Sequence, residues 1–202
     1  MADELLPLFP LGVVLLPQSQ VPLHIFEERY KEMIGEAIAL HAEFGIVLAS
    51  GNGIVNTGCT AVVENVVERY PDGRIDIVAM GLRRFEILSL NHEKSYLRGA
   101  VQFFDDEDPE ASEELRRRAV DAWRQAQDEP SELDSELPQL SFLLAQPIEE
   151  LSFRQQLLHS RSESERLRRL VEFFPTWRRH RLHAEHVRAV APQNGHGRWP
   201  LS

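Results

Sequence analysis

Near its N-terminus the chain reads Leu6-Pro7-Leu8-Phe9-Pro10-Leu11, then Leu16-Pro17, then Pro22-Leu23-His24-Ile25-Phe26-Glu27. Each proline removes a backbone N–H donor and fixes φ, so prolines this dense are incompatible with a central strand or a helix interior. The segment is therefore predicted to form short strands, broken at defined points, that lead directly into a helix.

The pattern up to about Phe104 predicts a β-rich region. Short apolar runs rich in β-branched residues lie between turn signals, at residues 13–16, 22–26, 45–48, 60–69, 74–80, 84–90 and 97–104. Pro71-Asp72-Gly73 is typical of a turn, so residues 60–80 are predicted to form a β-hairpin. One helix is expected at residues 27–40, because apolar residues recur there at helical spacing on one face.

Helical patterns replace strand patterns beyond Asp105. The run Asp105-Asp106-Glu107-Asp108 is too charged to bury, so a domain boundary is expected there. We expect a β-domain at residues 1–105, a helical bundle at 106–190 and a disordered tail at 191–202. Helices are predicted at 112–127, 133–145, from Pro147 to 159, and from a capping box at Ser162 to 174; Pro175 is expected to stop or kink the last one before a basic helix at 177–190.

Composition limits the functional classes. The 202 residues are 43% hydrophobic, which is enough for a substantial core, and the formal net charge of -10 argues against general binding of phosphate backbones. No leader pattern and no apolar stretch long enough for a membrane span is present. A lone cysteine, Cys59, fits a reducing compartment, so we expect a cytoplasmic protein; the preference for arginine over lysine favours a bacterial source.

The order of these pieces resembles the N-terminal substrate-binding domain of Lon proteases and the stand-alone proteins built from it. The matching residues are the proline-rich opening with Arg29-Tyr30, Phe44-Gly45, Gly58, Asp72-Gly73, and Gly81-Leu82-Arg83-Arg84-Phe85, with Ser162 to Phe174 resembling the family's later helices. The resemblance covers roughly residues 5–174. It implies an α+β fold: a PUA-like mixed β-barrel of about six strands with one helix, followed by a C-terminal helical bundle.

The resemblance also implies recognition of substrate proteins. No Gly-x-x-x-x-Gly-Lys-Ser/Thr phosphate loop occurs in the chain, and the sequence ends before any protease domain of the family. We therefore expect a non-enzymatic protein that neither hydrolyses ATP nor cuts its substrates.

Individual residues give little sign of catalysis or metal binding. His180, His183 and His186 are spaced so that only two could share a helix face, and the neighbouring arginines oppose cation binding. Cys59 precedes an apolar strand and is interpreted as a small core residue, and His24 as a core or rim histidine. We expect no catalytic residue, no metal site and no cofactor.

Protein or peptide recognition is the function that the sequence favours, because broken strands leave a sheet edge to which an extended segment could add. The partners expected are unfolded or peptide segments and a protease complex. The candidate peptide-binding residues are Leu11, Val13, Leu15, His24, Phe26, Arg83 and Phe85. The alternative is a small-molecule or RNA site in the β-domain, with Arg83-Arg84-Phe85 as the RNA-binding residues, although the acidic balance argues against nucleic acid.

Overall fold

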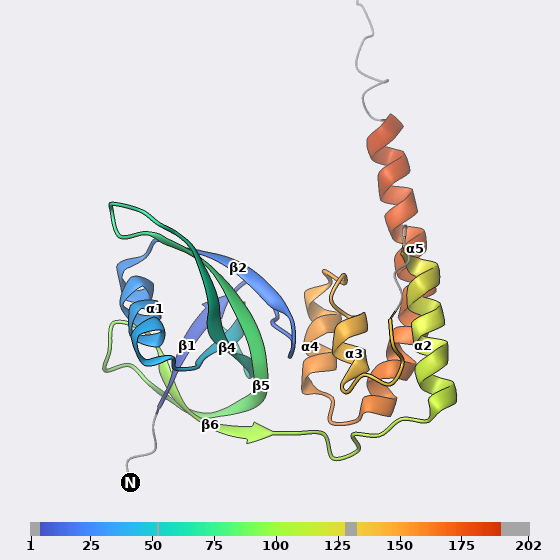
Figure 1. Ribbon diagram of the computed structural model, residues 1–202, viewed down its shortest axis with the longest axis horizontal. Helices are drawn as coiled ribbons and strands as arrows, with labels where there is room; N and C mark the ends of the chain where they lie inside the picture. The colour runs from blue at the N-terminus through green and yellow to red at the C-terminus, as the bar shows by residue number, and fades with distance from the viewer. Residues whose placement is uncertain (1–4, 52, 128–132, 191–202) are drawn as a thin grey trace, which may run out of the picture.

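A computed structural model describes residues 5–51, 53–127 and 133–190, with side chains described as far as residue 183. Six strands and one helix come first, followed by four more helices within the described residues (Figure 1). The elements are β1 (Leu6–Leu11), β2 (Gln20–Ile25), α1 (Glu28–Leu40), β3 (Phe44–Ser50), β4 (Gly53–Arg69), β5 (Ile75–Asn91), β6 (Arg98–Phe104), α2 (Glu113–Ala126), α3 (Leu140–Leu144), α4 (Leu151–His159) and α5 (Glu163–Val190).

The strands form one mixed sheet in the order β2-β5-β4-β3-β1-β6. The pair β1–β3 is parallel and the other pairs are antiparallel. Strand β6 pairs with both β1 and β5, but its pairing with β1 covers only Leu6 and Pro7. Strand β2 lies outside this series of pairings, on the far side of β5.

The predicted hairpin is present and is longer than the sequence indicated. Strands β4 and β5 pair along most of their length and are joined by a turn at residues 70–74, in which Gly73 has φ 84°. A positive φ of this size favours glycine. The two separate strands predicted at 74–80 and 84–90 are one continuous strand, β5, whereas the strand predicted at 13–16 is a loop whose residues Val14, Leu15 and Leu16 are buried.

Two helices match their predictions closely. In α1, Tyr30, Met33, Ile34 and Ala37 are buried, as their helical spacing requires. Helix α2 begins after Ser112, whose side chain accepts a hydrogen bond from the backbone N–H of Leu115. Such a cap satisfies one of the N–H groups that have no partner inside the helix.

Two predicted helices are longer than those observed, and the predicted stop at Pro175 is wrong. The helix expected at 133–145 is restricted to α3, because Pro138 and the left-handed Gln139 (φ 51°) precede it. The helix expected from Pro147 starts only at Leu151. Pro175 does not end the long helix: α5 continues through it to Val190 as one element. The capping hydrogen bond predicted at the start of α5 is present, from the N–H of Glu165 to the Ser162 hydroxyl.

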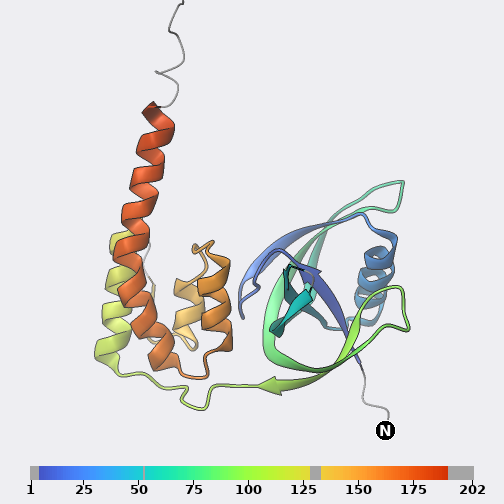
Figure 2. The same cartoon turned by 180° about the vertical axis from the view of Figure 1, so that it is seen from behind.

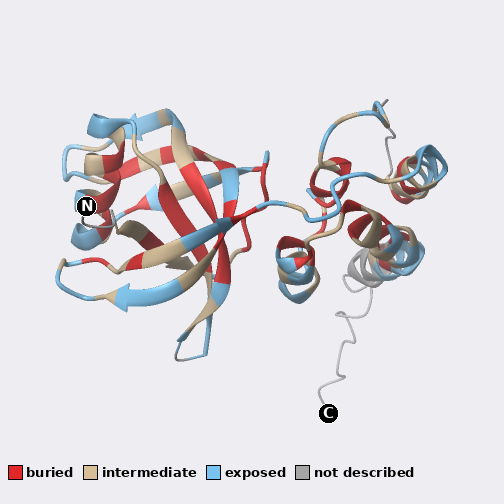
Figure 3. Ribbon diagram, turned by 90° about the horizontal axis from the view of Figure 1, so that it is seen from below, coloured by how far each residue is buried: buried red, intermediate tan, exposed pale blue. Residues whose placement is uncertain are grey.

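The buried residues extend from the sheet into the helical region (Figure 3). A single apolar cluster includes Phe9, Met33 and Ile77 from the β-region and Phe142 and Leu170 from the helices. A smaller buried cluster is formed by Leu8, Val47 and Phe85, which belong to three different strands. No helix within the described residues is both long and apolar enough to cross a membrane.

Candidate functional site

Strand β2 is an edge strand whose outer row of side chains faces solvent. Within the described residues it pairs with β5 alone. Its side chains alternate: Val21, Leu23 and Ile25 contribute to the core, whereas Gln20, Pro22 and His24 are exposed. Pro22 has no N–H to donate, which an edge strand tolerates.

An aromatic and acidic cluster lies at the C-terminal end of β2. His24 Nδ1 lies 2.5 Å from Asp76 Oδ1, and the Tyr70 hydroxyl donates to Asp76 Oδ2 at 2.7 Å. The His24 ring stacks on Phe26 with 5.9 Å between centroids and meets the Tyr70 ring edge-on at 6.0 Å. Phe26 is 60% exposed, so this cluster presents an aromatic face to solvent.

The hydrogen bonds determine the charges in this cluster. The hydrogen bonds from His24 and Tyr70 lower the pKa of Asp76, so its carboxylate is ionised at neutral pH. The same carboxylate raises the pKa of Tyr70 to about 12, so the phenol keeps its proton and remains a donor. Asp76 is therefore a fixed acceptor that orients both rings.

The cluster continues along the sheet as an apolar strip. Pro22 pairs with Val78 across β2 and β5, and directly paired residues of antiparallel strands project from the same face. Val78 is half-buried. We refer to the exposed row and its neighbours as the β2 surface, formed by Pro22, His24, Phe26, Tyr70, Asp76 and Val78.

The seven residues predicted to bind peptide lie in three different places. His24 and Phe26 lie together on the β2 surface. Leu11 and Val13 are half-buried against the main core, where Leu15 is 3% exposed, so Leu15 offers no surface to a ligand. Arg83 is exposed and pairs with Glu43 while lying over the Phe103 ring, and Phe85 is fully buried.

Arg84 and Phe85 are both buried, although they lie on opposite faces of β5. Phe85 pairs with Gly58 and Arg84 with Cys59 in regular register, and the register between β4 and β5 shifts only before Arg84. Cys59 pairs with Arg84 and Ala61 with Gly81, so Leu82 and Arg83 together oppose the single residue Thr60 in a β-bulge. The Arg83 N–H donates to the Thr60 hydroxyl. Phe85 packs with Leu8 and Val47, whereas Arg84 on the opposite face is covered by the helical region.

Gly81 permits a close backbone contact beside this bulge. Its carbonyl oxygen accepts a hydrogen bond from the N–H of Gln18, and its N–H donates to the carbonyl oxygen of Ser19. A Cβ atom at Gly81 would lie 2.3 Å from the carbonyl oxygen of Leu16. No side chain fits at that distance. The stretch Gly81 to Phe85 is thus explained by packing, and it presents no surface on which Arg84 or Phe85 could contact RNA.

Arg84 belongs to a buried ionic network that joins the sheet to the helices. Its guanidinium donates to Asp106 Oδ1 at 2.6 Å and to the carbonyl oxygens of Leu158 and Ser160. Arg166 of α5 donates to both Asp106 oxygens, to Glu163 and to the Ser141 hydroxyl. The two arginines and two carboxylates balance in charge.

Asp106 corrects an expectation from the sequence. Its acidic run is expected to be too charged to bury, yet its side chain is 5% exposed because two arginines neutralise it. Burial alone would raise the pKa of Asp106, but the hydrogen bonds and charge of Arg166 and Arg84 hold it below its ordinary value. The sequence carries no signal for this pairing, since the partners lie on β5 and α5.

A second contact between sheet and helices is made by Arg154 of α4. Its Nε donates to the carbonyl oxygen of Val14 at 3.0 Å, and its Nη1 donates to the carbonyl oxygens of Ala145, Gln146 and Ile148. Gln155 donates to the carbonyl oxygen of Thr57 on β4. These bonds hold the loop before β2, strand β4 and the segment after α3 against α4.

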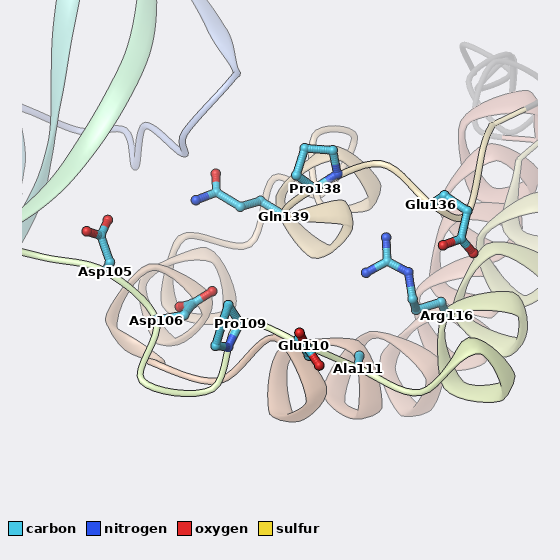
Figure 4. A pocket seen from close by; sticks show the side chains of 9 residues that line it. All are labelled: Asp105, Asp106, Pro109, Glu110, Ala111, Arg116, Glu136, Pro138 and Gln139. Atoms are coloured by element: carbon cyan, nitrogen blue, oxygen red, sulfur yellow. The ribbon is translucent and has the colours of Figure 1, made fainter.

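A pocket of about 550 Å³ opens where the segment after β6 meets the loop before α3 (Figure 4). Its polar lining is mostly carboxylate, from Asp105, Asp106, Glu110 and Glu136. The Arg116 guanidinium on its wall donates to the carbonyl oxygens of Ser135 and Leu137. Among the described residues, no three His, Cys, Asp or Glu side chains are grouped so that they could hold a metal ion.

Cys59 has the properties of a core residue. Its side chain is 0% exposed, and burial raises the pKa of its thiol to about 12. A thiol with such a pKa is almost entirely protonated at neutral pH and is a poor nucleophile.

Comparison with known proteins gives a consistent result. Residues 5–174 match the family model of the ATP-dependent protease La (LON) substrate-binding domain. A Lon protease of Parabacteroides distasonis is 27% identical over 119 residues, which are 54% of this chain and 14% of that protein. Lon protease 1 of Hydrogenovibrio crunogenus is 32% identical over 99 residues, 45% of this chain and 12% of that protein. The match thus spans a small part of each relative's length.

Two solved structures share the fold. The Lon N-terminal domain protein from Xanthomonas campestris superposes with a TM-score of 0.62 at 24% identity, covering 85% of this chain and 99% of that chain. The N-terminal domain of a Mycobacterium avium complex Lon protease gives a TM-score of 0.59 at 19% identity, covering 87% and 98%. The mixed sheet followed by helices is therefore the fold of Lon N-terminal domains.

Proposed function

The chain belongs to the Lon substrate-binding domain family, and from this premise we propose that it binds extended segments of protein substrates on the β2 surface. Family membership supports substrate recognition in general. The choice of surface and of extended segments is our proposal, and it rests on one observation: a solvent-facing edge strand carries an exposed aromatic pair, His24 and Phe26.

The chemistry of the β2 surface favours unfolded or peptide segments. Phe26 is 60% exposed, and Pro22 and Val78 extend the apolar contact along the strand. Apolar side chains are exposed in unfolded chains and buried in folded ones, so such a surface discriminates between the two. Because Pro22 lacks an N–H, side-chain contacts contribute more to the affinity than a full ladder of backbone hydrogen bonds.

We also propose that the chain has no catalytic activity and acts in the cytoplasm. Its proposed organisation is a PUA-like β-domain at residues 1–105 followed by a helical bundle at 106–190. The absence of a phosphate loop from this sequence and the buried Cys59 thiol support a non-enzymatic role. A protease complex is the class of partner to which bound segments would be delivered.

The alternative of a small-molecule or RNA site in the β-domain has less support. Leu8, Val47 and Phe85 pack against one another in a buried cluster, and Arg84 is bound by Asp106. The pocket beside the segment after β6, and a second pocket lined by residues of α2 and α5, both lie outside the sheet.

The proposal is tested with a reduced and alkylated, permanently unfolded protein as probe, and with the same protein in its native form. We expect the unfolded form alone to bind. Replacing His24 and Phe26 by alanine should weaken binding about tenfold, because the exposed aromatic contact is lost. Leu88→Ala is the matched control, since Leu88 is 65% exposed on β5 but lies outside the β2 surface. Equal binding by the double variant and the control would refute the choice of surface.

A further inference from the structure

The C-terminal part of α5 projects beyond the other helices. Figures 1 and 2 show from opposite sides that α5 continues past the ends of α2, α3 and α4. Along its first half α5 buries Leu167, Leu170 and Phe174 in the core, and Trp177 is the last buried residue described. Helix α5 therefore packs against the rest of the chain as far as Trp177 and projects beyond it after that residue.

The residues after Trp177 are mostly exposed and mostly basic. The basic end of α5, as we call it, consists of Arg178, Arg179, His180, Arg181, Leu182 and His183. The sequence contains no aspartate or glutamate from 173 to 184. Arg179 donates to the Thr176 hydroxyl, and Arg181 lies over the Trp177 ring at 4.9 Å. Within the described part of the chain, no carboxylate lies within ion-pair distance of Arg178 or Arg179.

The chain's own acidic run at Asp105 to Asp108 does not reach the basic end. It lies beside the opposite end of α5, where the Glu163 N–H donates to the carbonyl oxygen of Asp108. About 15 helical residues, or roughly 22 Å, separate Glu163 from Arg178. Asp106 is already bound by Arg84 and Arg166, and Glu107 by Arg161. Neutralisation of the basic end by this run is therefore not possible in this structure.

We propose that the basic end of α5 is a docking surface for an acidic, leucine-containing segment of a partner protein. Clustered cations on one helix repel one another, and an acidic partner relieves this repulsion. Leu182 is 48% exposed among the arginines and offers an apolar contact that a peptide can use. A protein segment suits the surface better than a nucleic acid does, because the whole chain has a net charge of -10 and repels a long polyanion.

This proposal is separate from substrate binding on the β2 surface. It concerns helix α5 and binding by charged arginines, whereas the β2 surface binds through aromatic and apolar side chains. Its test uses the full chain and a fluorescein-labelled peptide of glutamates interspersed with leucines. We expect saturable binding that weakens about tenfold or more when Arg178 and Arg179 are both replaced by glutamate. The matched control is Arg118→Glu with Arg168→Glu, which makes the same change in charge at two exposed arginines of α2 and the first half of α5.

Each outcome decides for or against the proposal. Loss of binding in the first double variant but not in the control supports it, and Arg178→Gln with Arg179→Gln should give a smaller loss in the same direction. Equal losses in both glutamate variants would show that only net charge matters and would overturn it. Absence of peptide binding at low salt, or tighter binding of a single-stranded oligonucleotide of equal charge, would also overturn it. Circular dichroism checks that each variant keeps its helix content.

Discussion

Arg84 of β5 and Asp106 of the segment after β6 form an ion pair of 2.6 Å with side chains only 2% and 5% exposed. The same carboxylate accepts from Arg166 of α5, so one acidic residue is shared by a strand and a helix that lie far apart in sequence. Buried charges persist only where their partners neutralise them. The junction between sheet and helices therefore depends on Asp106 more than on any neighbouring acid.

Asp106→Asn is expected to lower the free energy of unfolding by about 3–5 kcal/mol, because it leaves two buried guanidinium groups without their shared counter-ion. Urea unfolding followed by circular dichroism measures the change. Glu107→Gln is the control, since the Glu107 side chain is 76% exposed and pairs at 3.4 Å with Arg161. A similar loss in both variants would contradict the role given to Asp106.

Acid should weaken this junction in a defined direction. The folded pKa of Asp106 lies below its ordinary value of 3.8, so its contribution to stability is present at higher pH and is lost as the pH falls through the folded value. The difference in unfolding free energy between the native chain and Asp106→Asn should therefore be largest at neutral pH and shrink below about pH 4. A difference that stays constant from pH 7 to pH 3 would show that Asp106 acts through packing alone.

Gly81→Ala is expected to destabilise the chain by about 1–3 kcal/mol or more, because the new methyl group would lie 2.3 Å from the Leu16 carbonyl oxygen and force the backbone to move. Gly35→Ala on α1 should have the opposite effect. Nothing lies within 4 Å of a Cβ at Gly35, and alanine stabilises a helix interior by about 0.5–1 kcal/mol relative to glycine. Thermal melts of the two variants, displaced in opposite directions from the native chain, check both expectations.

The Cys59 thiol should resist alkylation in the native chain and react only on unfolding. Its side chain is fully buried, and burial raises its pKa to about 12. Labelling with iodoacetamide at pH 8, with and without denaturant, gives the comparison. Rapid labelling of the native chain would show that the strands around Cys59 open readily.

The sequence predicts the elements whose signals are local. The spacing in α1, the turn at residues 70–74 and the Ser162 cap all depend on neighbours within a few residues, and all three are present. Errors occur where a local signal competes with tertiary packing. Pro175 removes one backbone donor but does not end α5, and the apolar run at 13–16 is buried as a loop rather than as a strand.

The candidate site is predictable only in part. His24 and Phe26 are both among the residues predicted to bind peptide, and the structure places them together at the C-terminal end of β2. Their contact with Asp76 and Tyr70 depends on the register between β2 and β5, which no single-sequence pattern determines. The role of Arg84 likewise depends on carbonyl oxygens supplied by residues more than 70 positions away.

The shared carboxylate of Asp106 has a mechanical consequence. Helix α5 has 28 residues, a length of about 42 Å, and Arg166 anchors its first turn to the same group that holds Arg84. Arg166 lies about 36 Å from the far end along the helix, so a rotation of about 5° at this anchor moves that end by about 3 Å. Force applied to the projecting end is thus transmitted through a lever arm to strand β5, whose first half lies beside β2.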